Sequence, residues 1–102
     1  MLAGKQKKML KGKAHSLKPV VQIGKNGLTA QVLEQISNAL DRHELIKIKL
    51  IDFKDEKEEI AFETEKSLKC DICGIIGNTI ILFRQHKDPP KRKIKLSDEA
   101  GE

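Results

Sequence analysis

A short apolar run followed by two glycines three positions apart constrains the fold of this chain more than any other feature. Residues 20–23 (V-V-Q-I) form a run that is short enough for one buried strand. The tetrapeptide that follows consists of Gly24, Lys25, Asn26 and Gly27. Because an amphipathic segment begins directly behind it, the order predicts a tight loop that joins a strand to the N-terminus of a helix.

This tetrapeptide has the chemistry of an anion-binding loop. Glycine has no Cβ, so a phosphodiester can approach the main chain closely at Gly24 and Gly27. The first N–H groups of a helix point outward unpaired, and the helix dipole adds its positive potential to that of Lys25. The alternative is a plain strand-to-helix turn, because a G-x-x-G match recurs by chance and glycine is common in turns.

Positive charge is concentrated in the same third of the chain as this loop. The 102 residues carry a net charge of +5, and seven lysines precede Glu34, which is the first acidic residue. The rest of the chain contains more acidic than basic residues. A clustered positive field beside a phosphate-shaped loop indicates nucleic acid or an anionic surface as the partner. The alternative is a lysine-rich helix that serves solubility.

Most of the early lysines lie on a helix predicted over residues 2–17. Its apolar positions, which include Leu10, Ala14 and Leu17, share one side of a helical wheel, and a lysine ridge lies opposite. Pro19 is expected to end this helix, because the residue before a proline is pushed out of the helical region. The lysines expected to act together with the loop are Lys5, Lys8, Lys11 and Lys18.

The middle of the chain predicts a helix followed by a strand. Residues 28–43 have the broad apolar arc of an amphipathic helix. Residues 44–51 alternate, with apolar side chains on one face and Lys47 and Lys49 on the other. One dry and one wet face at this strand indicate that helices cover one side of the sheet.

The second half of the domain predicts a third helix and a hairpin. Residues 52–69 are acidic and favour a helix, although residues 60–64 could also alternate as a strand. Residues 71–83 contain two β-branched runs joined by Gly77 and Asn78, which is typical of a hairpin. We therefore expect one α/β domain over residues 1–86 and a mobile charged tail over residues 87–102.

Several classes of function are disfavoured. Cys70 and Cys73 have metal-ligand spacing, but no second ligand pair accompanies them, so two buried thiols are expected and no metal or cofactor. No serine or cysteine has a recognisable base nearby in the sequence, which argues against an enzyme. The chain has no apolar run long enough to cross a bilayer and no signal-peptide core, so we expect it in the cytoplasm.

Three motifs together resemble the CRM domain family, and within it the bacterial single-domain YhbY-type RNA-binding proteins. These motifs are A-H-x-L-K-P-V-V-Q-I-G-K-N-G-L, H-E-L-I-K-I-K-L and I-I-G-N-T-I-I-L-F-R. The resemblance implies a four-stranded mixed sheet with about three helices on one side, in a two-layer α/β domain similar to the C-terminal domain of a bacterial translation initiation factor. It also implies a KH-like G-x-x-G loop that contacts RNA at residues 24–27, with Arg84 as a further residue of the family pattern.

The resemblance further implies binding to ribosomal RNA in precursors of the large ribosomal subunit. With no Trp or Tyr and only three Phe, the chain lacks an aromatic platform for reading bases, so we expect binding to rest on phosphate contact and RNA shape. The alternative is a protein-interaction adaptor that docks on ribosomal proteins through the acidic segment, with lysines that serve solubility. Duplex DNA is a less favoured partner, because no DNA-binding signature is present, and a monomer is expected.

Overall fold

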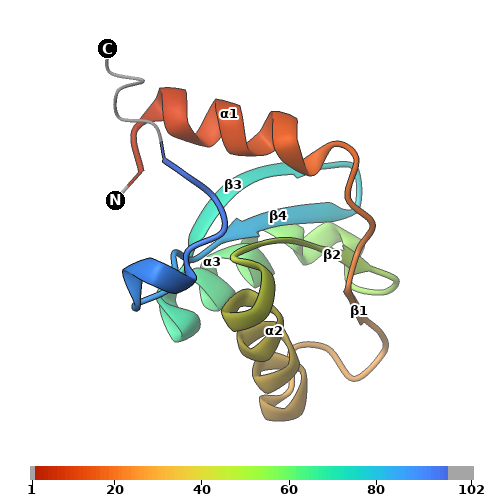
Figure 1. The fold of residues 1–102 in the computed structure, drawn as a ribbon. Coiled ribbons are helices and arrows are strands. Elements are labelled where there is room, and N and C mark those ends of the chain that lie inside the picture. The colour runs from red at the N-terminus through yellow and green to blue at the C-terminus, as the bar shows by residue number, and fades with distance from the viewer. Residues whose placement is uncertain (1, 97–102) are drawn as a thin grey trace.

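The computed structural model describes residues 2–96. Its helices are α1 (Gly4–Ala14), α2 (Ala30–His43) and α3 (Lys57–Leu68), with short 3-10 helices η1 (Lys54–Glu56) and η2 (Pro89–Lys91). Its strands are β1 (Val21–Ile23), β2 (Leu45–Leu50), β3 (Asp71–Ile76) and β4 (Thr79–Phe83). They form one four-stranded sheet in the order β1-β2-β4-β3, as Figure 1 shows. Strand β1 is parallel to β2 and the other pairs are antiparallel, so the predicted mixed sheet in an α/β fold is confirmed.

Helices α2 and α3 cover one face of this sheet. Ile36 and Leu40 of α2 and Ala61 of α3 lie in one buried cluster with Ile48 of β2 and Leu82 of β4. The four-residue spacing of Ile36 and Leu40 places both side chains on the same side of the helix. This cluster is the larger of the two apolar cores.

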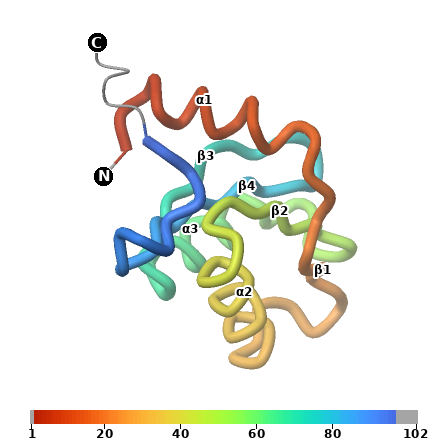
Figure 2. Tube along the Cα trace, in the orientation of Figure 1, coloured from red at the N-terminus to blue at the C-terminus, as the bar shows by residue number. Residues whose placement is uncertain are grey.

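Helix α1 covers the opposite face of the sheet (Figures 1 and 2). Leu10 and Ala14 of α1 are buried in a second cluster with Ile81 and Phe83 of β4. Successive side chains of a strand point to opposite faces, so β4 supplies Leu82 to one core and its two neighbours to the other. The expectation that all three helices pack on one side of a two-layer domain is therefore wrong, because the sheet lies between helices.

The difference arises at β4, which is buried on both faces. Its sequence, T-I-I-L-F, is apolar without alternation, as is typical of a strand covered on both sides. The alternation of β2 predicts that only one of its faces is covered. This prediction is correct at Lys49, because α1 does not extend over that side chain and leaves it exposed. Helix α1 packs instead over β3, β4 and the start of β2.

The first helix is shorter than predicted, since it ends at Ala14 and leaves Leu17 exposed. The link to β1 is held by Lys47 of β2, whose Nζ donates to the carbonyl oxygens of His15 (3.2 Å) and Leu17 (3.0 Å). The helix therefore ends four residues before Lys18, the residue whose conformation Pro19 restricts.

The second and third helices and the hairpin are confirmed. Helix α2 begins at Ala30, because the Oγ1 of Thr29 accepts the N–H of Val32 at 3.1 Å and so caps the helix. Residues 60–64 lie within α3, which excludes the strand alternative. No helix within residues 2–96 is long and apolar enough to cross a membrane.

The chain after β4 is fixed to the domain by Glu44, which is buried at the end of α2. Its Oε2 accepts the N–H of His86 at 2.7 Å, and its Oε1 accepts those of Lys93 (2.7 Å) and Ile94 (2.8 Å). Burial acts to raise the pKa of Glu44, but the three N–H donors outweigh it and lower the pKa below its ordinary value.

These hydrogen bonds differ from the expectation that the chain is a mobile tail from residue 87 onward. Ile94 and Leu96 pack against the core beneath α1, so residues 87–96 belong to the folded domain. A sequence pattern rich in charge and proline cannot reveal a carboxylate partner about fifty positions earlier. The rest of the predicted tail, residues 97–102, lies outside the described residues.

The two cysteines are buried free thiols, as predicted. Cys70 lies in the core of α2 and α3, whereas Cys73 lies in the core of α1, on the other face of the sheet. Burial raises the pKa of Cys70 to about 11 and that of Cys73 to about 12. Within the described part of the chain, no three His, Cys, Asp or Glu side chains are grouped so that they could hold a metal ion.

Candidate nucleic-acid interface

The loop of residues 24–27 joins β1 to α2 as an exposed turn. The carbonyl oxygen of Gly24 accepts the N–H of Gly27 at 3.0 Å, and the carbonyl oxygen of Gly27 accepts the N–H of Thr29 at 3.1 Å. Gly24, Lys25 and Asn26 are exposed. The loop is therefore accessible to a macromolecular partner and is not packed into the core.

The two glycines occupy different environments. Gly27 has a φ of 73°, which favours glycine, and the Phe53 ring lies 3.5 Å from where its Cβ would be. Gly24 has no positive φ, and nothing lies within 4 Å of its Cβ position. The fold thus explains why residue 27 is glycine, but it places no such requirement on residue 24. A bare main chain at Gly24 is the feature that close approach of a phosphate would use.

The electrostatic setting of the loop is positive. It leads into the N-terminus of α2, and the first turn of this helix contains no acidic residue. The partial positive charge of the helix end therefore acts in the same region as the ammonium group of Lys25. This combination suits an oxyanion such as a backbone phosphate.

The structure separates most of the early lysines from the loop. Lys5 and Lys8 are exposed on α1, which lies across the sheet from the segment that connects β1 to α2 (Figures 1 and 2). Lys11 lays its side-chain stem over Gly74 of β3, with its Cδ 3.2 Å from where a Cβ would be. Lys18 precedes β1, whereas the loop follows it. The lysines of α1 therefore do not form one basic surface with the loop, because α1 packs on the other face of the sheet, and Lys18 lies before the opposite end of β1.

A different lysine is brought toward the loop by strand pairing. Lys49 of β2 pairs in register with Gln22 of β1, two positions before Gly24, and its side chain is exposed. Lys47 lies one pleat further away and donates to carbonyl oxygens of the link after α1. The alternation of residues 44–51 predicts a basic face, but the parallel pairing with β1 could not be read from the sequence.

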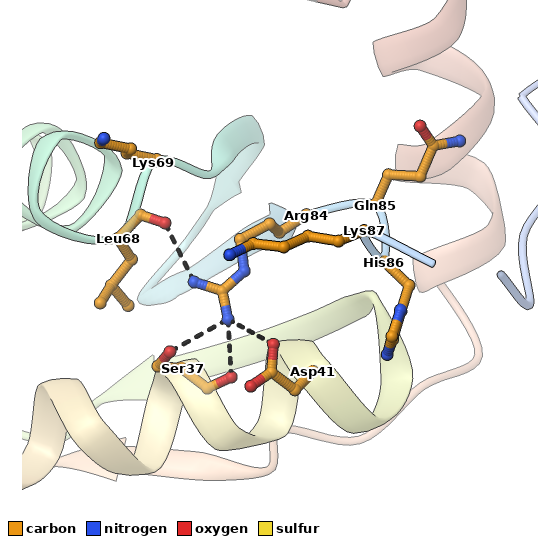
Figure 3. A pocket seen from close by; sticks show the side chains of 8 residues that line it. All are labelled: Ser37, Asp41, Leu68, Lys69, Arg84, Gln85, His86 and Lys87. Carbon is orange, nitrogen blue, oxygen red and sulfur yellow. Dashed lines mark hydrogen bonds and ion pairs between the residues drawn. The ribbon is translucent and has the colours of Figure 1, made fainter. Parts of the chain in front are cut away.

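The guanidinium group of Arg84 is held by hydrogen bonds within the protein, as Figure 3 shows. Its Nη1 donates to the carbonyl oxygen of Leu68 at 3.0 Å, at the end of α3. Its Nη2 lies 2.9 Å from the carbonyl oxygen of Ser37, 3.0 Å from the Oγ of the same residue and 2.9 Å from the Oδ1 of Asp41. Both terminal nitrogens are thus used within the protein, where they form a cross-link between β4, α2 and α3.

Comparison with known proteins places these features in a family. The sequence model of the CRS1/YhbY (CRM) domain matches residues 2–84. An RNA-binding protein of Haemophilus influenzae is 41% identical over 88 residues, which cover 85% of this chain and 89% of that protein. The "Probable RNA-binding protein YqeI" of Bacillus subtilis is 38% identical over 89 residues, which cover 86% of this chain and 93% of the relative.

A solved structure has the same fold. The solution structure of the hypothetical protein SAV1595 from Staphylococcus aureus superimposes with a TM-score of 0.78 at 32% sequence identity. The match covers 93% of this chain and all of the other. The similarity therefore extends through nearly all of this chain.

Proposed function

Because this chain belongs to the CRS1/YhbY (CRM) domain family, we propose that it binds RNA through the loop of residues 24–27. The observation that carries the proposal is the exposed turn at Gly24 and Lys25, which leads through Leu28 and Thr29 into the N-terminus of α2. Relatives that cover most of this chain are named RNA-binding proteins, which supports the same partner here.

The contact is made mainly to phosphates. Main-chain N–H groups near Gly24 and the ammonium group of Lys25 face the backbone of the RNA, and Lys49 extends the positive surface along the sheet. Such contacts fix the position of the RNA but carry little sequence information. Affinity therefore falls steeply as the salt concentration rises. The role is one of binding and not of catalysis.

The RNA is ribosomal, in a precursor of the large ribosomal subunit, and the protein acts as a cytoplasmic monomer that assists assembly. This finer assignment rests on the resemblance to YhbY-type proteins. The test is sedimentation of cell extract on gradients at low and high salt. Co-migration with large-subunit precursors at low salt and release at high salt support the assignment, whereas protein found only in the top fractions at low salt contradicts it.

The second candidate is an adaptor that docks on ribosomal proteins. The observation that favours it is the outer surface of α3, which carries several glutamates and Phe62, a 60% exposed residue with the Nζ of Lys66 5.5 Å from the centre of its ring. Competition of labelled ribosomal RNA with duplex DNA and with basic ribosomal proteins at equal salt separates the candidates. An RNA-binding protein prefers the RNA, and an adaptor retains its protein partner in the presence of excess RNA.

A further inference from the structure

Phe53 has an unusual backbone conformation. Its φ of 60° and ψ of 36° place it in the left-handed region, three residues after the end of β2 and directly before η1. A bulky side chain rarely adopts this conformation, and strained residues of this kind concentrate at functional sites. Two hydrogen bonds fix the segment, since the N–H groups of Ile51 (2.9 Å) and Asp52 (3.3 Å) both donate to the carbonyl oxygen of Ile23.

These bonds hold Phe53 beside the loop. Ile23 is the last residue of β1 and immediately precedes Gly24, so the end of β2 and the loop lie next to each other. The Cε2 of the Phe53 ring is the heavy atom nearest to the Cβ position of Gly27. The residue is nevertheless 42% exposed. Part of the aromatic surface is therefore open to solvent beside the residues that would contact phosphate.

We propose that Phe53 stacks on an unpaired base of the RNA whose phosphates contact residues 24–27. This inference rests on the proposed function and specifies the RNA as single-stranded at the loop. Stacking on an aromatic ring accepts any base, because every base has a π-face, so one phenylalanine adds affinity without strong sequence preference. It also adds an aromatic contact that was not expected from the small number of aromatic residues in the sequence.

The charges around Phe53 fit a base better than a phosphate. The exposed charged residues next to Phe53 in the sequence are Asp52, Lys54, Asp55 and Glu56, and their net negative charge disfavours a phosphate group there. Lys25 belongs to the loop whose Gly27 the ring contacts, and its ammonium group attracts a phosphate. A nucleotide that places its phosphate at the loop and its uncharged base over the ring satisfies both environments.

The first test compares Phe53→Leu with Phe62→Leu on two probes, single-stranded oligouridylate and inorganic polyphosphate. Leucine keeps an apolar contact with Gly27 but removes the π-face. We expect Phe53→Leu to weaken oligouridylate binding on the order of fivefold to a hundredfold and to leave polyphosphate binding unchanged. Phe62 is an exposed phenylalanine of α3, and its variant should bind both probes like the wild type. Thermal unfolding of both variants shows whether they are folded.

The second test gives a direct signal, because the chain contains no Trp or Tyr. In Phe53→Trp the new indole is the only tryptophan, and stacking on a base should quench its fluorescence when oligouridylate is added, but not when polyphosphate is added. Phe62→Trp should show neither change. Unaltered fluorescence of Phe53→Trp at saturating oligouridylate would overturn the stacking proposal even if Phe53→Leu failed to fold.

The outcomes distinguish this proposal from the proposed function. If the wild type bound oligouridylate and Phe53→Leu bound it equally well, stacking would be refuted and RNA binding by the loop would stand. If the wild type bound neither probe, both proposals would fall. Equal losses on oligouridylate and polyphosphate in Phe53→Leu would mean that the ring only holds the loop in place, which also contradicts stacking.

Discussion

Arg84 reaches from the end of β4 to Asp41 on α2, where its Nη2 lies 2.9 Å from the Oδ1 of the carboxylate. The same guanidinium donates to the carbonyl oxygens of Leu68 and Ser37. The side chain of Arg84 is only 22% exposed, whereas that of Asp41 is 68% exposed. The bonds to main-chain carbonyls are thus the protected part of this cross-link, and the ion pair is its solvent-facing part.

Replacement of Arg84 by Ala should therefore affect folding more than RNA binding. Loss of the guanidinium removes its partly buried hydrogen bonds to the carbonyl oxygens of Leu68 and Ser37, and we expect the free energy of unfolding to fall by about 1–3 kcal/mol. The control Asp41→Ala removes only the exposed ion pair and should cost about 0–1 kcal/mol. Chemical denaturation and RNA titration at a temperature where both variants are folded measure the two effects. A large loss of RNA affinity in a stable Arg84→Ala protein would contradict the structural role.

Glu44 should make the domain sensitive to acid. Its pKa is lowered in the folded protein, because its carboxylate accepts three backbone N–H groups. The stabilisation is fully present above the pKa of an unfolded glutamate, about 4.3, and is lost as the pH falls through the lower value of the folded state. Denaturation of the wild type and Glu44→Gln across this range measures the difference between them, which should shrink at low pH.

The same variant should release the segment after β4. The amide of Gln presents a donor where the carboxylate accepts N–H groups, so at neutral pH we expect a loss of about 1–3 kcal/mol. Hydrogen exchange at the N–H groups of Lys93 and Ile94 should become faster, while exchange in β4 changes less. Unchanged protection at these two positions would show that the carboxylate does not hold the segment.

The two loop glycines should respond differently to Ala. Gly27→Ala places a Cβ at a positive φ beside Phe53, so we expect a destabilisation of about 1–2 kcal/mol. Gly24→Ala meets open space at an ordinary φ, so its stability should be close to that of the wild type. If a phosphate approaches the main chain at Gly24, this fold-neutral variant still loses RNA affinity. Wild-type affinity in Gly24→Ala would remove the argument for close approach at that residue.

Lys47 and Lys49 lie on the same face of β2, but their replacement should have different effects: the first on stability and the second on RNA binding. Lys47 donates to carbonyl oxygens after α1, so Lys47→Ala should lower the unfolding temperature. Lys49 is exposed near the loop, so Lys49→Ala should leave the unfolding temperature unchanged and reduce the slope of log affinity against log salt by about 1. Identical salt slopes for the wild type and Lys49→Ala would place this lysine outside the interface.

Much of the fold can be predicted from local sequence patterns. The glycine spacing predicts the β1–α2 turn, and the apolar arc of residues 28–43 predicts α2, because each depends on residues that are close together in the chain. The side of the sheet that α1 covers could not be predicted, because periodicity shows which side chains are buried but not against which element. The unalternating run of β4 was the signal that both faces are covered.

The candidate site was predictable in part for the same reason. Residues 24–27 are contiguous, so their turn and its charge follow from the sequence. Most partners of Arg84 and Glu44 lie more than forty positions away, and the position of Phe53 beside Gly27 depends on the parallel pairing of β1 and β2. Such contacts can be recognised only when the arrangement of the strands in the sheet is known.

RNA binding by the loop of residues 24–27 is tested most directly by comparing the RNA affinities of Lys25→Glu and Lys87→Glu. Both residues are exposed and both changes alter the net charge equally, but Lys87 follows β4 at the end of the sheet away from the loop. We predict that Lys25→Glu weakens binding of single-stranded RNA about tenfold or more at low salt, since it places a negative charge at a phosphate contact. Lys87→Glu should bind within about threefold of the wild type, because Lys87 follows β4 at the other end of the sheet and its charge meets no phosphate in the proposed interface. Equal affinities for the two variants would contradict the claim that this loop binds RNA.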